Sequence, residues 1–263
     1  MIKIATPVSH LALDKDAFKD IIKASDCLEM RPGTLNISSN EEVYHCDSIQ
    51  INHELTDDII NSVCDTINNA KKLKLVAFHC ATNCSDPVLN GKKFMQRGLV
   101  YNHSEMIYNG TRNIEKIRKK ISNHVELAVE NNNYYETEWA NPYDIVTDAN
   151  FLNEFVNETN IGFLFDVSHA KVTCFNKKIN YDEYVRQLPM HKLKQIQLCQ
   201  YSIIDNECVD LHEKPNASTI LHSIALALKY GCDYLTIEYY KNHFDLLDSI
   251  NYMRNALNAR VNL

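Results

Sequence analysis

The sequence predicts a parallel (β/α)₈ barrel, the α/β fold in which strands and helices alternate and the strands close into a cylinder. Eight short apolar runs with the character of buried strands are separated mostly by segments of helical period. The chain has 263 residues, close to the usual length of such a barrel. Several of the apolar runs also end in an acidic residue or a histidine, and barrel enzymes place their catalytic groups at these strand ends.

The predicted strands are short apolar runs, several of them bounded by breaker residues or by polar termini. In chain order they are residues 2–6, 27–30, 48–53, 73–79, 125–131, 162–165, 195–199 and 234–239. The third, SIQINH, alternates strictly between apolar and polar residues, which indicates a strand with one buried face.

The predicted helices show apolar residues at helical spacing and, in places, a recognisable cap. They are residues 14–25, 56–72, 104–122, 150–157, 181–187, 218–230 and 244–257. Thr56 or Asp57 can cap the second of them, and Gly231 stands where the helix that ends near residue 230 needs its terminating residue. Residues 31–47 hold no convincing helix, so the helix after the second strand is expected to be short or missing.

Organisation beyond these elements is simple. Residues 80–103 form the longest irregular segment, and a loop of this length in a compact domain is more often a functional cover than a passive link. The sequence has no internal repeat and no linker-like composition. We therefore expect one barrel domain that comprises residues 1–263.

Composition excludes some classes of function. The chain has 27 basic and 34 acidic residues, a net charge of −7, and only short basic clusters, so tight binding to nucleic acid or to an anionic membrane is not expected. We expect a soluble cytoplasmic protein, because no segment is long enough to span a bilayer and no basic and apolar signal opens the chain. The nine cysteines are expected to be free thiols. Cys80 and Cys84 alone have a metal-like spacing, and without a second pair they do not predict a zinc site.

Polar residues at the strand ends are the main functional signal. Residues two apart in a strand share a face, so His79 lies over Ala77 and Asp166 over Leu164. If that face is the barrel interior, these side chains converge at one mouth. Asp166 and His169 stand where the sixth strand gives way to a loop, and the loop residues Asp210 and His212 after the seventh strand can reach the same place. The alternative role of Asp166 is to cap the segment that follows. The candidates are His53, His79, Glu130, Asp166, His169, Asp210, His212 and Glu238.

This residue set predicts a metal centre. Carboxylates and imidazoles without thiolates suit iron, manganese or zinc, and eight candidates exceed what one ion needs. Two or more ions that share bridging carboxylates are therefore the simplest interpretation, and a hydrogen-bonded polar plug is the alternative. The other histidines are expected to be surface or satisfied residues: His10, His45, His103, His124, His191, His222 and His243.

Four motifs carry a resemblance to a known family. They are VENNNYY, FLFDVSHAKVTC, YVRQLP and IQLCQYSIIDNECVDLHEKP, which fall between residues 125 and 240. Together they resemble the multinuclear non-haem iron-dependent oxidative enzymes, which include the methanobactin-biosynthesis oxidase, within the xylose-isomerase-like barrel superfamily. Asp-x-x-His-Ala and Asp-x-His are fairly specific as a pair, whereas either motif alone is common in the superfamily.

The resemblance implies an oxidoreductase that uses two or three iron ions and O₂ to oxidise a residue, often cysteine, of a ribosomally made precursor peptide. It also implies a small peptide-binding partner protein. The eight candidates above would be the ligands, with Glu130, Asp166 and Glu238 as catalytic residues. Gln197 departs from the pattern, because relatives commonly have histidine on the seventh strand, and this puts one ion in doubt.

Three alternatives stay open. A sugar or sugar-phosphate isomerase or epimerase would use Glu130 and Glu238 as an acid and base around one manganese or zinc ion, and the final region EYYKNHFDLLDSI looks more like that branch. An apurinic-site endonuclease would need a basic face, which the acidic composition does not favour. A non-catalytic barrel would not need so complete a set of ligands.

Overall fold

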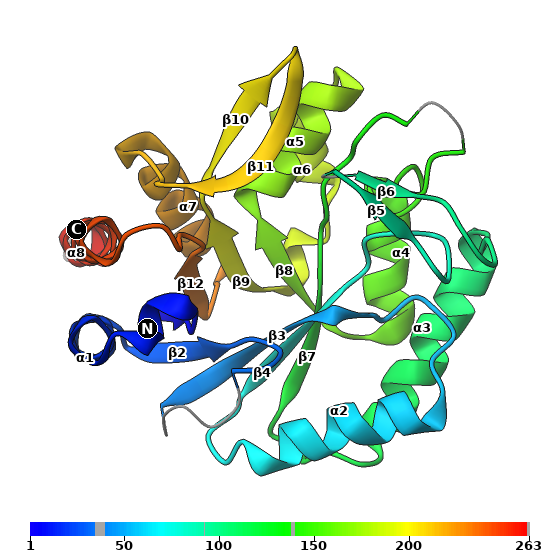
Figure 1. Ribbon diagram of the computed structural model, residues 1–263, viewed down its shortest axis with the longest axis horizontal. Coiled ribbons are helices and arrows are strands. Elements are labelled where there is room, and N and C mark those ends of the chain that lie inside the picture. Colours follow the sequence, from blue (N-terminus) through cyan, green and yellow to red (C-terminus); the bar gives the residue numbers. More distant parts are fainter. Residues whose placement is uncertain (35–39, 92, 138–139, 262–263) are drawn as a thin grey trace.

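The computed structural model describes residues 1–34, 40–91, 93–137 and 140–261 (Figure 1). Within them, eight strands form a closed barrel in the order β1-β12-β9-β8-β7-β4-β3-β2, and every neighbouring pair is parallel. The barrel strands are β1 (Lys3–Pro7), β2 (Cys27–Met30), β3 (Glu41–Gln50), β4 (Leu75–His79), β7 (Glu126–Glu130), β8 (Gly162–Asp166), β9 (Leu193–Leu198) and β12 (Tyr234–Ile237). The predicted parallel barrel is confirmed.

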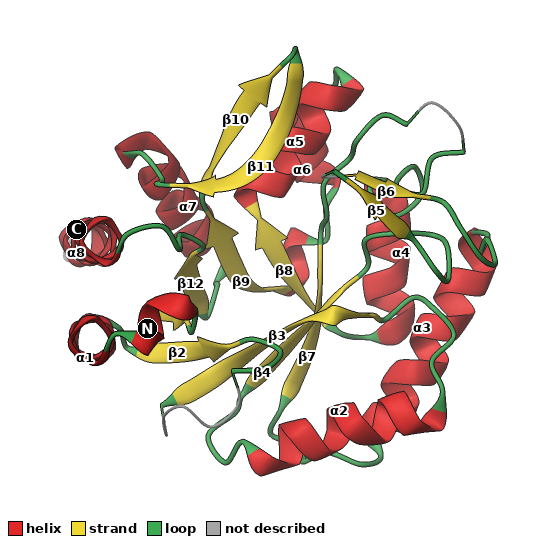
Figure 2. Cartoon of the chain, viewed as in Figure 1, coloured by secondary structure: helices red, strands yellow, loops and turns green. Residues whose placement is uncertain are grey.

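Helices surround the barrel on its outside (Figure 2). They are α1 (Lys15–Ala24), α2 (Asp57–Asn69), α3 (His103–Arg118), α4 (Ala149–Thr159), α5 (Val167–Lys177), α6 (Tyr181–Gln187), α7 (Ala217–Tyr230) and α8 (His243–Val261), with short 3₁₀ turns η1 (His10–Leu13) and η2 (Met190–Lys192). Between β2 and β3, residues 31–34 and 40 form no helix, and residues 35–39 of the expected short or missing helix lie outside the described part of the chain. Among all the described helices, none has the length and apolar character needed to cross a bilayer.

Capping side chains explain where most helices begin. Thr56 accepts a hydrogen bond from the backbone of Ile59, and Asn102 forms a reciprocal capping box with Glu105. Gly231 ends α7 in the left-handed conformation, at φ 79°, which confirms the stop predicted there.

Two apolar layers hold the barrel. The inner layer fills the cylinder with small and medium side chains and one tyrosine, namely Ala5, Cys27, Val43, Leu75, Ala77, Ala128, Leu164 and Tyr234. The outer layer packs the other face of each strand against the helices and includes the large buried rings of Phe155, Phe163 and Phe165. Alternation along each strand therefore assigns every residue to one layer or the other.

The third strand differs from its prediction, which placed it at residues 48–53. The structure places β3 at Glu41–Gln50, and residues 51–53 form a turn. Val43 belongs to the inner layer and Tyr44 to the outer one, so His45 shares the inner face with Val43. The SIQINH alternation misled because its last residues leave the sheet, after a register irregularity between Cys46 and Gln50.

The segment after β8 also differs from its prediction. Asp166 and His169 were expected in a loop, but α5 begins at Val167 with no intervening loop. Asp166 is its N-cap, since its Oδ1 accepts a hydrogen bond from the backbone N–H of His169 at 2.6 Å. His169 is therefore fixed on the first turn of a helix.

Two hairpins extend from the barrel and were not predicted. One pairs β5 (Val88–Asn90) with β6 (Lys93–Met95) inside the segment expected to be irregular. The other pairs β10 (Gln200–Ile204) with β11 (Glu207–Glu213), follows β9 directly, and packs against α5 (Figure 1). Asp210 and His212, expected in a loop, therefore lie on a strand.

The contact between α3 and α4 predicts a test of packing. A Cβ at Gly110 would overlap the ring of the buried Phe155, so we expect Gly110→Ala to destabilise the protein. Overpacking costs about 1–3 kcal/mol and outweighs the gain in helix propensity of about 1 kcal/mol. Urea unfolding measures the change. Ser104→Ala on the exposed face of the same helix is the control, and equal stability of the two variants would contradict this packing.

Candidate metal centre

A polar pocket lies at the carboxyl ends of the barrel strands. Its volume is about 390 Å³, and its wall combines ionisable groups from the strand ends with aromatic side chains. Phe94 of the β5–β6 hairpin and Tyr135 and Tyr143 of the segment after β7 form the aromatic part. The backbone N–H of Phe94 donates a hydrogen bond to the Tyr143 hydroxyl, which ties the hairpin to that segment.

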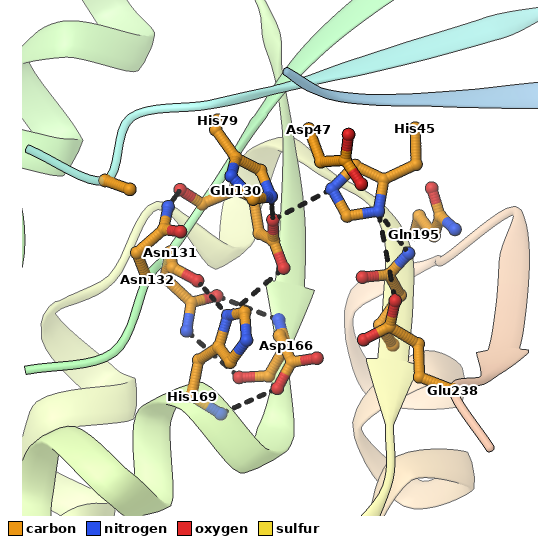
Figure 3. Close-up of polar contacts among 12 residues, drawn as sticks. His45, Asp47, His79, Glu130, Asn131, Asn132, Asp166, His169, Gln195 and Glu238 are labelled. Atoms are coloured by element: carbon orange, nitrogen blue, oxygen red, sulfur yellow. Dashed lines mark hydrogen bonds and ion pairs between the residues drawn. The ribbon is translucent and has the colours of Figure 1, made fainter. Parts of the chain in front are cut away.

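Glu130 is the centre of this pocket floor (Figure 3). Its carboxylate is fully buried at the end of β7, and imidazoles from three other elements contact it. Glu130 Oε2 lies 3.0 Å from His45 Nε2 and 3.0 Å from His79 Nε2, and Oε1 lies 3.1 Å from His169 Nδ1. One carboxylate thus joins β3, β4 and α5.

Asn131 holds this arrangement in place. Its side chain exchanges hydrogen bonds with the backbone of Asp166, at 2.8 and 3.0 Å, and so fixes the end of β8 against β7. Its backbone carbonyl accepts a hydrogen bond from His169 Nδ1 at 2.8 Å. This bond places the proton of a neutral His169 on Nδ1 and leaves Nε2 with the lone pair.

His169 and the β10–β11 hairpin close one side of the pocket. His169 Nε2 lies 3.2 Å from Asp210 Oδ2, and His212 Nε2 lies 3.5 Å from the same oxygen. His212 Nε2 is also 3.4 Å from Glu238 Oε2, which follows β12. The hairpin therefore links the end of β8 to the end of β12.

Glu29 and Arg31 form the remaining side. Glu29 is fully buried on β2, and Arg31 Nη2 lies 2.6 Å from its Oε1 and also contacts Glu238 Oε1. Gln197 donates to Glu29 Oε1 at 3.2 Å, and its Nε2 lies 3.1 Å from His45 Nδ1. Gln195 and Thr236 add further donors to Glu29.

The charges of these groups shift one another's pKa. Burial acts to raise the pKa of Glu130, but His45, His169 and His79 outweigh it and hold the pKa well below its ordinary value. Burial raises the pKa of Asp166 to about 8, although His169 opposes the rise. Burial acts to lower the pKa of His169, but Asp166 and Glu130 raise it well above its ordinary value.

Three groups of side chains have the composition and spacing of metal sites. In each group one possible ligand atom per residue lies within 4.8 Å of the others. The groups are His45, His79 and Glu130; Glu130, Asp166 and His169; and Glu29, His45 and Glu238. Glu130 Oε1 and Asp166 Oδ2 are buried without a hydrogen-bond partner, a costly state that a bound cation relieves. The first two groups therefore fit metal ions.

Seven of the eight predicted ligands lie around the pocket or in its floor: His79, Glu130, Asp166, His169, Asp210, His212 and Glu238. His53 does not. Its Nε2 lies 2.8 Å from the Thr82 carbonyl, to which it donates, and it is absent from the three groups. His53 was misplaced because Ile51, two positions before it, belongs to the outer layer and not to the inner face.

Sequence reasoning missed two residues of the floor. His45 was expected to be a surface or satisfied histidine, and Glu29 was not considered. Both follow from alternation along the strands, since Cys27 and Val43 belong to the inner layer and the residues two positions later share that face. Cys80 and Cys84 are buried and belong to none of the groups found among the described residues.

Two solved structures share the overall barrel architecture of this chain. A D-tagatose 3-epimerase-like protein matches with a TM-score of 0.65 and 16% identity, covering 99% of this chain and 100% of the other. A putative xylose isomerase from Rhodospirillum rubrum matches with a TM-score of 0.58 and 12% identity, covering 98% and 99%. At these identities the likeness concerns the fold. No curated protein matches the sequence significantly.

The family follows from the sequence itself. A profile described as "RiPP precursor modification enzyme MbnB/TglH/ChrH" matches residues 54–249, where RiPP denotes a ribosomally synthesised and post-translationally modified peptide. The match includes most of the pocket floor and both hairpins. The chain belongs to this family of enzymes, which confirms the family indicated by the four sequence motifs.

The position of His212 predicts a pH dependence of stability in metal-free protein. Burial acts to lower its pKa, but Glu238 and Asp210 raise it to about 9, against about 6.5 when unfolded. His212 therefore contributes stability that is complete below pH 6.5 and is lost as the pH rises through 9. His212→Asn tolerates the left-handed backbone at φ 48°. In urea unfolding with EDTA, we expect this variant to be less stable than the wild type at pH 6 and similar near pH 9.5; a constant difference would contradict the ion pairs.

Proposed function

We propose that this protein is a multinuclear non-haem iron enzyme that uses O₂ to oxidise a residue, most simply cysteine, of a ribosomally made precursor peptide. The observation that carries the proposal is the Glu130 carboxylate, which two candidate metal groups share. A carboxylate between two ions is a common bridge, and the imidazole and carboxylate ligands suit iron. Membership of a family of RiPP-modifying enzymes supports a peptide as the substrate.

Two ions would be held by the groups that meet at Glu130. His45, His79 and Glu130 would bind one, and Glu130, Asp166 and His169 would bind the other. Iron held by these residues would supply the redox chemistry and the activation of O₂. The protein would supply geometry, since Asn131 fixes the ring of His169 and the alignment of β7 with β8.

The pocket would hold the reacting residue of the peptide. Its aromatic side chains, Phe94, Tyr135 and Tyr143, would exclude water from that residue. His79 and His212 are the imidazoles of the site most open to the pocket, with side chains 21% and 41% exposed. In the metal-free protein Glu238 and Asp210 raise the pKa of His212 against the opposing effect of burial, and its exposed imidazole would be the group placed to deliver a proton.

The rest of the peptide would lie outside a pocket of this size. A small partner protein that binds the precursor would therefore complete the system, as the family resemblance implies. The barrel, taken as one domain of residues 1–263, would provide the chemistry.

An isomerase is the second candidate, because the D-tagatose 3-epimerase-like structure shares the fold along nearly the whole chain. In that function Glu130 and Glu238 would act as the acid and base. The geometry favours it less, since Glu130 is fully buried beneath three imidazoles and Glu238 is paired with Arg31. O₂ dependence separates the two functions, because an isomerase consumes none.

Replacement of Asp166 tests the function. We expect Asp166→Asn to lose metal and O₂-dependent activity together, because an amide is a weaker, neutral ligand. Metal per chain is measured after anaerobic purification, and activity as O₂-dependent mass change of a Cys-containing precursor peptide. Asp148→Asn is the matched control, since Asp148 caps α4 as Asp166 caps α5 and lies outside the three groups. Full metal content with normal turnover in Asp166→Asn would refute the proposal.

The two histidines whose positions sequence reasoning interchanged provide a second test. We expect His45→Gln to lower the number of bound ions by one, because His45 belongs to one of the two groups that meet at Glu130. His53→Gln should leave the metal content unchanged, since its ring bonds to the Thr82 carbonyl. Elemental analysis of both variants in parallel measures the metal content. Loss of metal from His53→Gln but not from His45→Gln would show that the metal centre does not include His45.

A further inference from the structure

The third group, Glu29, His45 and Glu238, differs from the other two in charge. Its two carboxylates already share a cation, because Arg31 Nη2 lies 2.6 Å from Glu29 Oε1 and also contacts Glu238 Oε1. A guanidinium stays charged throughout the physiological pH range. The position at which a divalent ion would join these two carboxylates is therefore taken by a side chain.

Hydrogen bonding also distinguishes the third group from the two groups at Glu130. Glu29 receives donors from Gln195, Gln197 and Thr236 in addition to Arg31. Glu238 receives a further hydrogen bond from the Tyr240 hydroxyl, at 3.1 Å. Both carboxylates are thus satisfied without an ion.

The two groups at Glu130 show the opposite condition. Glu130 Oε1 and Asp166 Oδ2 are buried without a hydrogen-bond partner. Among the described residues, no lysine or arginine forms an ion pair with either carboxylate. The ion pair of Glu130 Oε1 is with His169, which is itself a candidate metal ligand, so a metal ion can bind these oxygens. The carboxylates of Glu29 and Glu238 are instead paired with Arg31, which cannot bind a metal ion.

Gln197 also disfavours a metal ion at the third group. It lies on β9 next to the third group, with its Nε2 3.1 Å from His45 Nδ1 and 3.2 Å from Glu29 Oε1. The Gln197 amide nitrogen donates to Glu29 and does not bind a metal ion. Its Oε1 is buried without a hydrogen-bond partner and is a weak, neutral metal ligand at best. A histidine here would have added a ligand.

From these contacts we propose that Arg31 is a built-in cation that replaces a third metal ion, so that the centre holds two exchangeable ions, both at Glu130. The inference rests on the proposed metal function. Arg31 supplies one positive charge that neither dissociates nor changes oxidation state. Gln197 keeps the ligand set of that position incomplete.

Counting ions in matched variants tests this. Each protein is loaded anaerobically with excess Fe²⁺, freed of unbound metal, and analysed for iron per chain. We expect two ions in the wild type and two in Arg31→Lys, which keeps the charge. Arg31→Met together with Gln197→His removes the cation and adds a ligand, so we expect three. Circular dichroism confirms folding of each variant.

The outcomes separate the two proposals. Three ions in the wild type, or two in the folded double variant, would overturn the role of Arg31 and leave the metal function intact. No bound ion in the wild type would contradict the metal function itself. The double variant could unfold in the absence of metal, because Glu29 and Glu238 would then be buried without a cation. In that case we expect refolding with excess Mn²⁺ to restore the folded protein. Continued unfolding with Mn²⁺ would also overturn the inference.

Discussion

The buried carboxylate of Glu130 is the constraint on which the rest of the site depends. A carboxylate without solvent needs positive charge nearby, and loss of one partner from such a buried pair costs about 3–5 kcal/mol. Here the partners are the imidazoles of His45, His79 and His169, which come from β3, β4 and α5. The closed barrel supplies these elements from residues far apart in sequence and brings their ends to one point. The site and the fold therefore depend on each other.

Much of this could be predicted from alternation along the strands. Where the predicted strand boundary was right, the residue two positions after an inner-layer residue lies in the metal-ligand groups. His79 follows Ala77 in this way, and Asp166 follows Leu164. The same count applied to β2 would have found Glu29, two residues after Cys27. The order of the eight barrel strands was predictable because the apolar runs are short and mostly separated by helical periods.

The remaining features depend on contacts that local pattern does not contain. SIQINH alternates as a strand does, but the register irregularity in β3 ends the sheet at Gln50, which put His53 in the place of His45. The start of α5 directly after β8 depends on the Asp166 cap, a role that the sequence offered only as an alternative. The β10–β11 hairpin is stabilised by packing against α5, so its sequence alone did not indicate a strand around Asp210 and His212.

The three groups at the mouth differ in what balances their charge: histidines balance Glu130, while Arg31 balances Glu29 and Glu238. The central claim is that metal binds at Glu130. Anomalous diffraction at the iron edge, from crystals of anaerobically purified protein, tests it most directly. We expect two peaks, each within bonding distance of a Glu130 oxygen. Iron bound only elsewhere, or no peak beside Glu130 in fully loaded crystals, would contradict it.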